Sequence, residues 1–432
     1  MLVVALQNLV AYSVNMLDNI MLGSYSQNAL SGAATVNQIF FIVNQLALSI
    51  GNALVAICSQ YWGKQETEEI RKLTGAALAL SIMIAAVVVT ACTCMPERLL
   101  GIFTTSPEII AEGKAYLGLL KWTFLLFMIS NLLIAMLRSV EVVKISFVIS
   151  VVSLITNGCI NYTLIFGHFG FPQLGVSGAA IGTVVSRVIE MSINIIGGSR
   201  NLYLKDAIKM KKVPFDTTKE MLKRGLPLLC NEILWSISIA LISQSYSTRG
   251  IIAVAAINIT TTVTNFFMIV CYAMGNSISI VVGQQLGAGE IEKAKDYDLK
   301  MLFMNFVMCL AIGIVLFNVS SLIPQIYNTS LEVKALASQL LKIAACMLPI
   351  ISIYYSSYFT MRAGGKTFLT FLFDSGYTFV FTFMSALLLT RLTSLPILTI
   401  YLLVQCVDIP KATLGLVLVR KGIWVHNIVS DL

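Results

Sequence analysis

Three acidic residues lie in long apolar runs without a basic residue one helical turn away: Asp18, Glu232 and Asp374. A charge at the centre of a membrane helix costs roughly 2.5–3.5 kcal/mol even on the lenient insertion scale. Three arrangements relieve that cost: a partner on another helix, a bound cation, or protonation of the carboxylate. The last two are what an ion-coupled transporter requires, and for these acids all three stay open.

The other ionisable residues in apolar runs fall into two pairs with a spacing of three. Arg187 precedes Glu190, and Asp408 precedes Lys411. Residues three apart are neighbours on the surface of a helix, so opposite charges at this spacing can pair locally. We predict that each pair neutralises itself on its own helix and has a structural role.

Amide and hydroxyl side chains recur at helical spacing in four apolar runs. They are Asn8, Tyr12, Asn15 and Asn19 or Asp18; Gln38, Gln45, Ser49 and Asn52; Ser150, Ser153, Asn157 and Asn161; and Asn258, Thr262, Asn265, Tyr272 and Asn276. A helix surrounded by lipid alone has no use for such groups. Hydrogen bonding between helices is the alternative for any single residue, but four stripes in corresponding parts of the chain favour a wet cavity.

The elements that carry these residues are predicted to be membrane helices. Of the 432 residues, 57% are hydrophobic and 12% are charged, roughly half the charged fraction of a soluble domain. The apolar runs are long enough to cross a bilayer, and they are continuous rather than alternating, which favours helices over a β-barrel. We predict an all-α integral membrane protein with about twelve spans, near 2–24, 33–60, 73–95, 115–137, 145–166, 177–198, 225–246, 251–282, 299–323, 339–361, 367–390 and 395–419.

The distribution of basic residues predicts the orientation of the chain. Joints on one side of the membrane carry 20 of the 29 Lys and Arg residues, whereas the opposite joints carry only Arg98, Lys114, Arg249, Lys334 and Arg391. The positive-inside rule therefore places both termini in the cytoplasm. We expect a multi-pass protein of the plasma (inner) membrane, and the net charge of +8 is not interpreted as a nucleic-acid site. The first span begins almost at Met1, which leaves open a native start upstream.

The chain is an internal duplication with a spacing of 224 residues. Gly51-Asn52 recurs as Gly275-Asn276, Gln60 and Gly63 recur as Gln284 and Gly287, and Arg138 recurs as Arg362. Many matched polar residues at one spacing indicate a repeated unit. Six spans per copy are an even number, so the two lobes should be related by an axis along the membrane normal, with a substrate path between them.

We predict an N-lobe over 1–198, a cytoplasmic linker over 199–224 and a C-lobe over 225–432. The linker contains Lys205, Lys209, Lys211 and Lys212 before Pro214. Its composition suggests a surface helix, and binding of anionic lipid headgroups is a secondary interpretation.

Several segments, in their order along the chain, resemble one transporter family. They are Asn15-Met-Leu-Asp-Asn-Ile-Met-Leu-Gly23, Gly51 through Gly63, Asn157 with Asn161-Tyr-Thr-Leu-Ile-Phe-Gly167, Gly175-Val-Ser-Gly-Ala-Ala-Ile-Gly-Thr183, Gly283-Gln-Gln-Leu-Gly-Ala-Gly289 and Met361-Arg-Ala-Gly-Gly365. Together with the duplication, they make the chain similar to the multidrug and toxic compound extrusion (MATE) family of secondary transporters. The resemblance runs over nearly the whole chain. It implies two six-helix lobes that export cationic or amphipathic compounds in exchange for H⁺ or Na⁺.

The resemblance also implies roles for individual residues. Asp18 matches the first-span acid at the centre of the N-lobe cation or proton site, Asn157 and Thr183 match its neighbours, and Glu232 matches the seventh-span acid of the C-lobe. We therefore predict a coupling site of Asp18, Asn157, Asn161 and Thr183. The predicted substrate cavity comprises Glu232, Gln38, Asn258, Asn265, Met268, Tyr272, Tyr354 and Asp374.

The chain departs from the family pattern at three places. Asn161 stands where cation-binding members have a second carboxylate, Ser352, Tyr354 and Tyr355 surround the position of a tenth-span acid near Ile351, and Val3 replaces a first-span proline. Asn supplies an oxygen but no charge. Protonation of Asp18 is thus favoured over a Na⁺ site, and a mechanism that needs bending at the proline is in question.

Two other functions, a lipid flippase and a membrane-embedded enzyme, fit the sequence less well than coupled efflux. A flippase for lipid-linked saccharides would carry anionic cargo and need cationic cavity residues, but Arg187 and Lys411 are the only clear intramembrane cations and both have predicted partners. A membrane-embedded enzyme would need a catalytic cluster, but the two histidines, His168 and His426, lie in a joint and in the tail. We predict a monomeric transporter without enzymatic activity or cofactor, whose partners are the lipid bilayer and lipophilic or cationic small molecules.

Overall fold

The computed structural model describes residues 2–104, 106–200, 215–327 and 329–427. Its main helices are α1 (Leu2–Tyr25), α2 (Gln27–Gly63), α3 (Thr67–Cys94), α4 (Pro96–Gly101), α5 (Pro107–Ser139), α6 (Val143–Phe166), α7 (Val176–Arg200), α8 (Phe215–Ser247), α9 (Ile251–Gly287), α10 (Ile291–Val319), α11 (Leu331–Ala363), α12 (Thr367–Phe371), α13 (Met384–Leu392), α14 (Ile397–Cys406) and α15 (Asp408–Arg420). Within the described ranges no β-strand occurs. The prediction of an all-α fold is confirmed.

Eleven helices among the described residues are long and apolar enough to cross a membrane. The first of them starts at Ala29, and the 24-residue helix α1, which contains the first predicted span, is not among the eleven. The protein is therefore a multi-pass membrane protein. Pro227 and Pro349 are accommodated inside α8 and α11.

The predicted linker lies only partly within the described residues. Ser199 and Arg200 belong to the end of α7, and residues 215–224 form the first turns of α8. Residues 201–214, which include Lys205, Lys209, Lys211, Lys212 and Pro214, lie outside the described part of the chain. The surface helix proposed for this segment stays a prediction.

The last two spans are irregular, which hydropathy did not predict. The span from Thr367 to Leu392 contains two π-helical stretches, Leu372–Gly376 and Thr378–Phe383, between α12 and α13. The next span is interrupted at Val407, between α14 and α15, just before Pro410. Proline lacks an amide hydrogen and its ring clashes with the preceding turn, which accounts for a break at this position.

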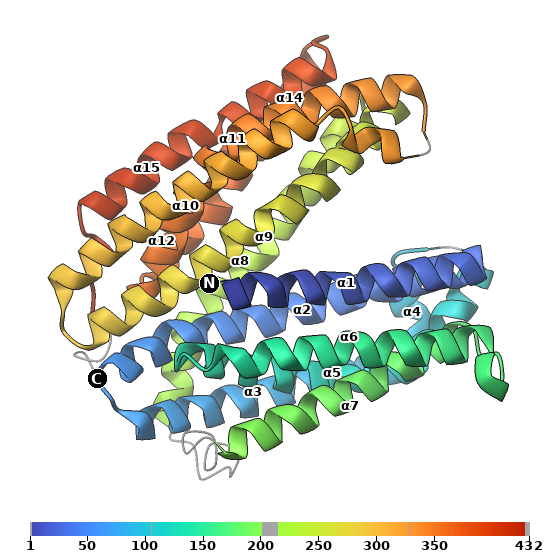
Figure 1. Ribbon diagram of the computed structural model, residues 1–432, viewed down its shortest axis with the longest axis horizontal. Helices are drawn as coiled ribbons and strands as arrows, with labels where there is room; N and C mark the ends of the chain where they lie inside the picture. The colour runs from blue at the N-terminus through green and yellow to red at the C-terminus, as the bar shows by residue number, and fades with distance from the viewer. Residues whose placement is uncertain (1, 105, 201–214, 328, 428–432) are drawn as a thin grey trace. The chain divides into compact units, whose positions relative to one another are not determined.

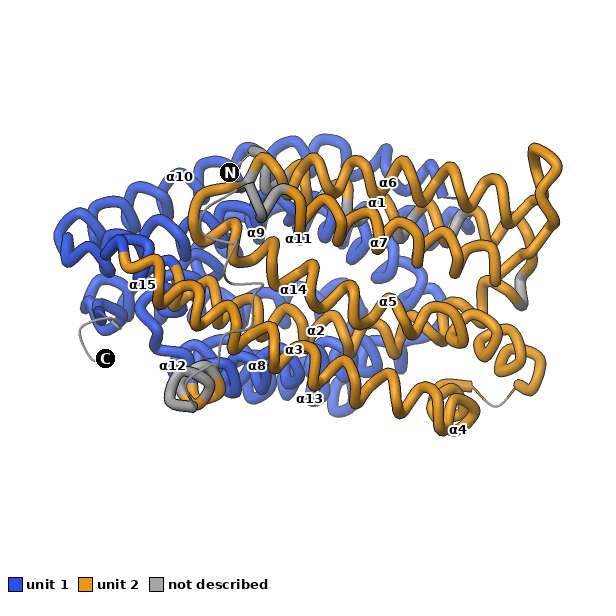
Figure 2. Tube along the Cα trace, turned by 90° about the horizontal axis from the view of Figure 1, so that it is seen from below, with its two compact units in different colours: residues 1, 59–65, 224–432 blue, residues 2–58, 66–223 orange. Residues whose placement is uncertain are grey.

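The chain divides into two compact units (Figure 2). The N-terminal unit comprises residues 2–58 and 66–223, and the C-terminal unit comprises residues 59–65 and 224–432. In the N-terminal unit, α6 packs against α1 and α7, and α5 packs against α3 and α7 (Figure 1). Leu117, Phe124 and Leu137 of α5 are completely buried there.

The C-terminal unit is built around α9 and α11. These two helices pack against each other, and both pack against α10. One core cluster includes Leu340, Leu341 and Leu348 of α11, and a second includes Met274 of α9 and Trp424 from the C-terminal tail.

Two glycines at equivalent positions of the repeat allow a close backbone crossing in the C-terminal unit. A Cβ atom on Gly63 would lie 1.9 Å from the carbonyl oxygen of Gln284, and one on Gly287 would lie 1.8 Å from that of Gln60. The contacts are reciprocal, because Gln60 and Gln284 are themselves related by the 224-residue spacing. The repeat noticed in the sequence thus marks a place where backbone touches backbone.

We expect Gly63→Ala to destabilise the protein by about 3 kcal/mol, at the upper end of the overpacking range, because the clashing atom belongs to the backbone and cannot rotate away. Unfolding of the purified protein in mixed micelles by denaturant measures the change. Gly118→Ala is the matched control, because no atom lies within 4 Å of a Cβ at that position. Equal losses in the two variants would contradict the close crossing.

Candidate functional site

The four predicted coupling residues form one hydrogen-bonded chain in the N-terminal unit. The Asn161 amide donates to Oδ1 of Asp18 at 2.5 Å and to Oδ1 of Asn157 at 3.2 Å. The Asn157 amide donates in turn to Oγ1 of Thr183 at 3.4 Å. Asp18 comes from α1, the two asparagines from α6 and Thr183 from α7, so three helices converge on a single carboxylate.

Small residues allow these helices to approach. A Cβ on Gly182 would lie 2.0 Å from Oδ1 of Asn161, and a Cβ on Gly178 would lie 2.7 Å from the backbone of Leu164. Close approach of backbones through glycine is the usual packing device of membrane helices. Asn157 and Asn161 are completely buried as a result, and Asp18 is half-buried.

One oxygen of this chain has no hydrogen-bond donor. Oδ1 of Asn161 is buried and has no partner among the described residues. Asp18 is the only carboxylate in the chain of contacts, and among the residues described no group of three or more His, Cys, Asp or Glu could hold a metal ion. The other possible ligands for a cation such as Na⁺ would be the neutral oxygens of Asn157, Asn161 and Thr183. However, Asn161 faces Asp18 with its NH₂ group, which donates a hydrogen bond and cannot bind a cation.

Two further side chains act on this cluster. Tyr116 of α5 is buried, and its hydroxyl is within hydrogen-bonding reach of Thr183 and within electrostatic range of Asp18. The Arg187 charge also acts on Asp18 from α7. This is a longer-range electrostatic effect, because the ion pair of Arg187 is with Glu190.

The predicted pairing of Arg187 with Glu190 is confirmed. Nη1 of Arg187 lies 2.6 Å from Oε2 of Glu190, and the Arg187 guanidinium lies 4.9 Å from the centroid of the Phe127 ring. Glu190 also accepts a hydrogen bond of 2.7 Å from Ser130, which in turn accepts one from Asn194. The pair links α7 to α5 within the N-terminal unit.

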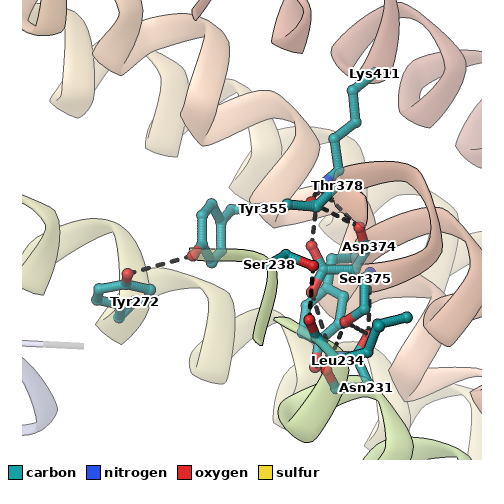
Figure 3. Close-up of polar contacts among 10 residues, drawn as sticks. Asn231, Leu234, Ser238, Tyr272, Tyr355, Asp374, Ser375, Thr378 and Lys411 are labelled. Atoms are coloured by element: carbon teal, nitrogen blue, oxygen red, sulfur yellow. Dashed lines mark hydrogen bonds and ion pairs between the residues drawn. The ribbon is translucent and has the colours of Figure 1, made fainter. Parts of the chain in front are cut away.

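The predicted pairing of Asp408 with Lys411 is wrong. Nζ of Lys411 lies 2.9 Å from Oδ1 of Asp374, on a different helix, and also donates to the backbone oxygen of Asp374 and to Thr378 (Figure 3). Asp408 retains only a longer-range electrostatic contact with Lys411. Asp408 and Lys411 both lie in the first turn of α15, but the lysine ammonium reaches Asp374 and Thr378 of the preceding span instead of the acid on its own helix.

Asn231 completes the surroundings of Asp374. Its amide donates to Oδ2 of Asp374 at 3.2 Å, and its own oxygens accept from the amide and hydroxyl of Ser375 (Figure 3). Asn231 is buried and precedes Glu232 on α8, and Glu232 lies within electrostatic range of Tyr358. The predicted acid of the seventh span and Asp374 thus belong to the same region of the C-terminal unit.

The structure places the other predicted cavity residues in varied surroundings. The Tyr272 hydroxyl accepts a hydrogen bond from Tyr355 at 3.3 Å, and Met268 is buried in the core cluster. Tyr354 lies with its ring against Lys411. Gln38 is exposed on α2, Asn258 is exposed on α9, and Asn265 is half-buried on α9. Their roles in substrate binding stay predictions.

The sequence patterns did not place Tyr116 or Arg187 near Asp18, or Asn231 or Lys411 near Asp374. One signal for two of them was present: Lys411 follows Arg187 by 224 residues, the spacing of the repeat. A cation therefore recurs at the equivalent position of each half. No periodicity in the sequence marks Tyr116 or Asn231.

Relatives of known name cover most of the chain. It is 23% identical over 364 residues to the probable multidrug resistance protein NorM of Thermotoga maritima, covering 84% of this chain and 78% of that protein. It is 25% identical over 356 residues to the uncharacterized transporter YisQ of Bacillus subtilis, covering 81% of this chain and 77% of that protein.

Solved structures share the fold. A MOP superfamily transporter from Pyrococcus furiosus superimposes with a TM-score of 0.89 at 16% identity, covering 98% of this chain and 94% of that chain. The bent form of the Vibrio cholerae MATE transporter VcmN gives a TM-score of 0.89 at 16% identity, covering 98% of this chain and 96% of that chain. At these identities the likeness establishes the fold alone.

The family model described as MatE matches residues 4–163 and 227–383. These two ranges fall in the two halves of the sequence repeat, and together they include most of the chain. The match confirms the resemblance found in the sequence motifs: the chain belongs to the MatE family.

Proposed function

We propose that the protein is a secondary antiporter that exports cationic or amphipathic small molecules in exchange for H⁺, with Na⁺ as the second candidate for the coupling ion. The observation that carries the proposal is the single carboxylate of Asp18, held by Asn161 between three helices of the N-terminal unit. The names of the relatives, a probable multidrug resistance protein and a transporter, support a transporter rather than an enzyme.

Proton exchange is favoured by the composition of the N-terminal cluster. A second carboxylate is absent from the described contacts of Asp18, and its nearest partner is an amide that donates a hydrogen bond. A site with one carboxylate can be neutralised by one proton, whereas a Na⁺ ion would also need the Asn161 amide to turn its oxygen inward. In this scheme Asp18 takes up the proton. Asn157 and Thr183 hold the Asn161 side chain in place through their hydrogen bonds.

Alternating access supplies the coupling between ion and cargo. The N-terminal and C-terminal lobes would rock between inward-open and outward-open states, and each ligand would favour the state that it binds more tightly. Asp18 would serve the coupling ion, and the acids and aromatic residues of the C-terminal unit would serve the cargo. We retain the predicted lobes 1–198 and 225–432, a cytoplasmic position for both termini, the plasma (inner) membrane and a monomeric state as parts of this proposal.

The lipid-linked saccharide flippase is less well supported. Anionic cargo calls for unpaired cations, but Arg187 pairs with Glu190 and Lys411 pairs with Asp374. Neither of these two cations is free to bind an anionic cargo.

The proposal is tested by efflux of a lipophilic cationic dye from membrane vesicles under an imposed pH gradient or an imposed Na⁺ gradient. We expect the pH gradient to drive dye movement and the Na⁺ gradient to have little effect. Vesicles without the protein are the control. A response to the Na⁺ gradient alone would reverse the choice of ion, and a response to neither gradient would exclude coupled antiport.

A further inference from the structure

The Lys411 ammonium lies in a cage that satisfies every one of its donors. Its three N–H groups face Oδ1 of Asp374 at 2.9 Å, Oγ1 of Thr378 at 3.1 Å and the backbone oxygen of Asp374 at 3.3 Å. Nζ also lies 4.5 Å from the centroid of the Tyr354 ring, with Phe373 and Tyr377 at 5.8 and 5.9 Å. A carboxylate combined with aromatic faces within about 6 Å is the chemistry that recognises organic ammonium groups.

Two of the three helices that meet at this cage are irregular there, and the third, α11, contributes Tyr354. Asp374 lies in the first π-helical stretch, and Lys411 follows the break at Val407, whose carbonyl oxygen accepts a hydrogen bond of 3.0 Å from Tyr377. π-helical turns occur frequently at functional sites, and broken membrane helices commonly form substrate sites. A purely structural ion pair would need neither feature.

Two acids lie near the single Lys411 cation: Asp374 in the cage and Asp408 outside it. Asp374 and Asp408 both interact electrostatically with Lys411, so the group carries an excess negative charge when all three are ionised. The side chain of Asp374 is 15% exposed, whereas that of Lys411 is 2% exposed. The amide of Asn231 donates to the second oxygen of this carboxylate.

We propose that this cage, made of Asp374, Thr378, Tyr354, Phe373 and Tyr377, is a binding site for the ammonium group of a cargo molecule, and that Lys411 is its resident occupant in the absence of cargo. The inference rests on the proposed export of cationic compounds and assigns the part of the C-terminal unit that binds the cation. Cargo binding displaces the lysine from Asp374 and places the cargo ammonium against the Tyr354 ring. The cargo ammonium takes over the charge of Asp374, and the displaced Lys411 ammonium is compensated by Asp408, with which it already interacts electrostatically.

The test is equilibrium binding of radiolabelled phenethylammonium to the full-length protein in nanodiscs, without any ion gradient. A site filled by its own lysine for more than about nine-tenths of the time binds an external ligand at least about tenfold more weakly than the vacant site. We therefore expect Lys411→Met to bind phenethylammonium at least about tenfold more tightly than the wild type. Asp374→Asn should weaken binding by a similar factor in the wild-type background. Lys411→Gln, whose amide can still donate to Asp374, provides a second neutral variant if Lys411→Met does not fold.

Lys300→Met is the matched control. It removes a lysine that pairs with Asp296 at 2.6 Å on the exposed surface of α10, and it should leave phenethylammonium binding unchanged. Unaltered affinity in both neutral Lys411 variants, or binding that does not depend on Asp374, would overturn the cage as a cargo site. Because no gradient is applied, this outcome is distinct from a failure of antiport in the vesicle experiment.

Discussion

Asp18→Asn is expected to abolish dye efflux driven by a pH gradient, reducing the initial rate at least about tenfold. Asn has nearly the shape of Asp and can still contact the Asn161 side chain, which now lies 2.5 Å from the carboxylate. It cannot take up or release a proton, so the site stays in one charge state throughout the cycle. The measurement is the initial rate of dye movement in vesicles that contain equal amounts of each protein.

A direct binding measurement separates loss of coupling from loss of folding. Purified Asp18→Asn protein should still bind the dye, because the proposed cargo site lies in the other unit. Asp296→Asn provides the matched acid-to-amide control, because Asp296 lies on the exposed surface of α10. Undiminished gradient-driven efflux by the Asp18 variant would remove this residue from the coupling role.

Glu190→Ala is expected to lower the free energy of unfolding by about 3 kcal/mol, in the range for breaking a buried ion pair. The side chain of Glu190 is 8% exposed, and its loss leaves both Arg187 and Ser130 without the partner that they contact at 2.6 and 2.7 Å. The remaining cation is partly shielded by the Phe127 ring, which cannot accept a conventional hydrogen bond. Denaturant unfolding in mixed micelles measures the effect.

Replacing both charges should cost less than replacing one. The double variant Arg187→Met with Glu190→Met removes the pair without leaving an isolated charge, and buried pairs replaced in this way often cause little loss. Glu292→Ala tests the same substitution at an exposed pair with Lys295, where we expect less than about 1 kcal/mol. A similarly small loss for Glu190→Ala would show that the N-terminal pair contributes little to stability.

The two ion pairs show where sequence spacing suffices and where it does not. Arg187 and Glu190 lie within the uninterrupted helix α7, so a separation of three residues places them together, as predicted. Asp408 and Lys411 have the same separation within α15, but Lys411 reaches Asp374 of the preceding span instead. Helical spacing shows which side chains of one helix can pair, but it does not reveal a competing partner on a neighbouring helix.

The N-terminal cluster was more accessible to prediction. Asn157 and Asn161 are four residues apart on one helix, so their contact follows from helical geometry. Their contact with Asp18 was implied by family resemblance, and the approach of Tyr116 and Arg187 depends on packing of α5 and α7 that no local pattern encodes. The buried acids themselves were visible because charge is rare and costly in apolar segments.

Hydropathy, period and charge are properties of residues along the chain, so they predict the membrane class, the helical fold, the duplication and the isolated acids. The partner of each acid depends on how separate helices pack, so it is known only from the folded structure. Asp374 contacts Lys411 and Asn231 of two other helices, and Asp18 contacts Asn161 of another helix. An unpaired charge inside a bilayer is costly, so each buried acid needs such a contact. Which side chain provides the contact depends on how the helices pack in each folded unit.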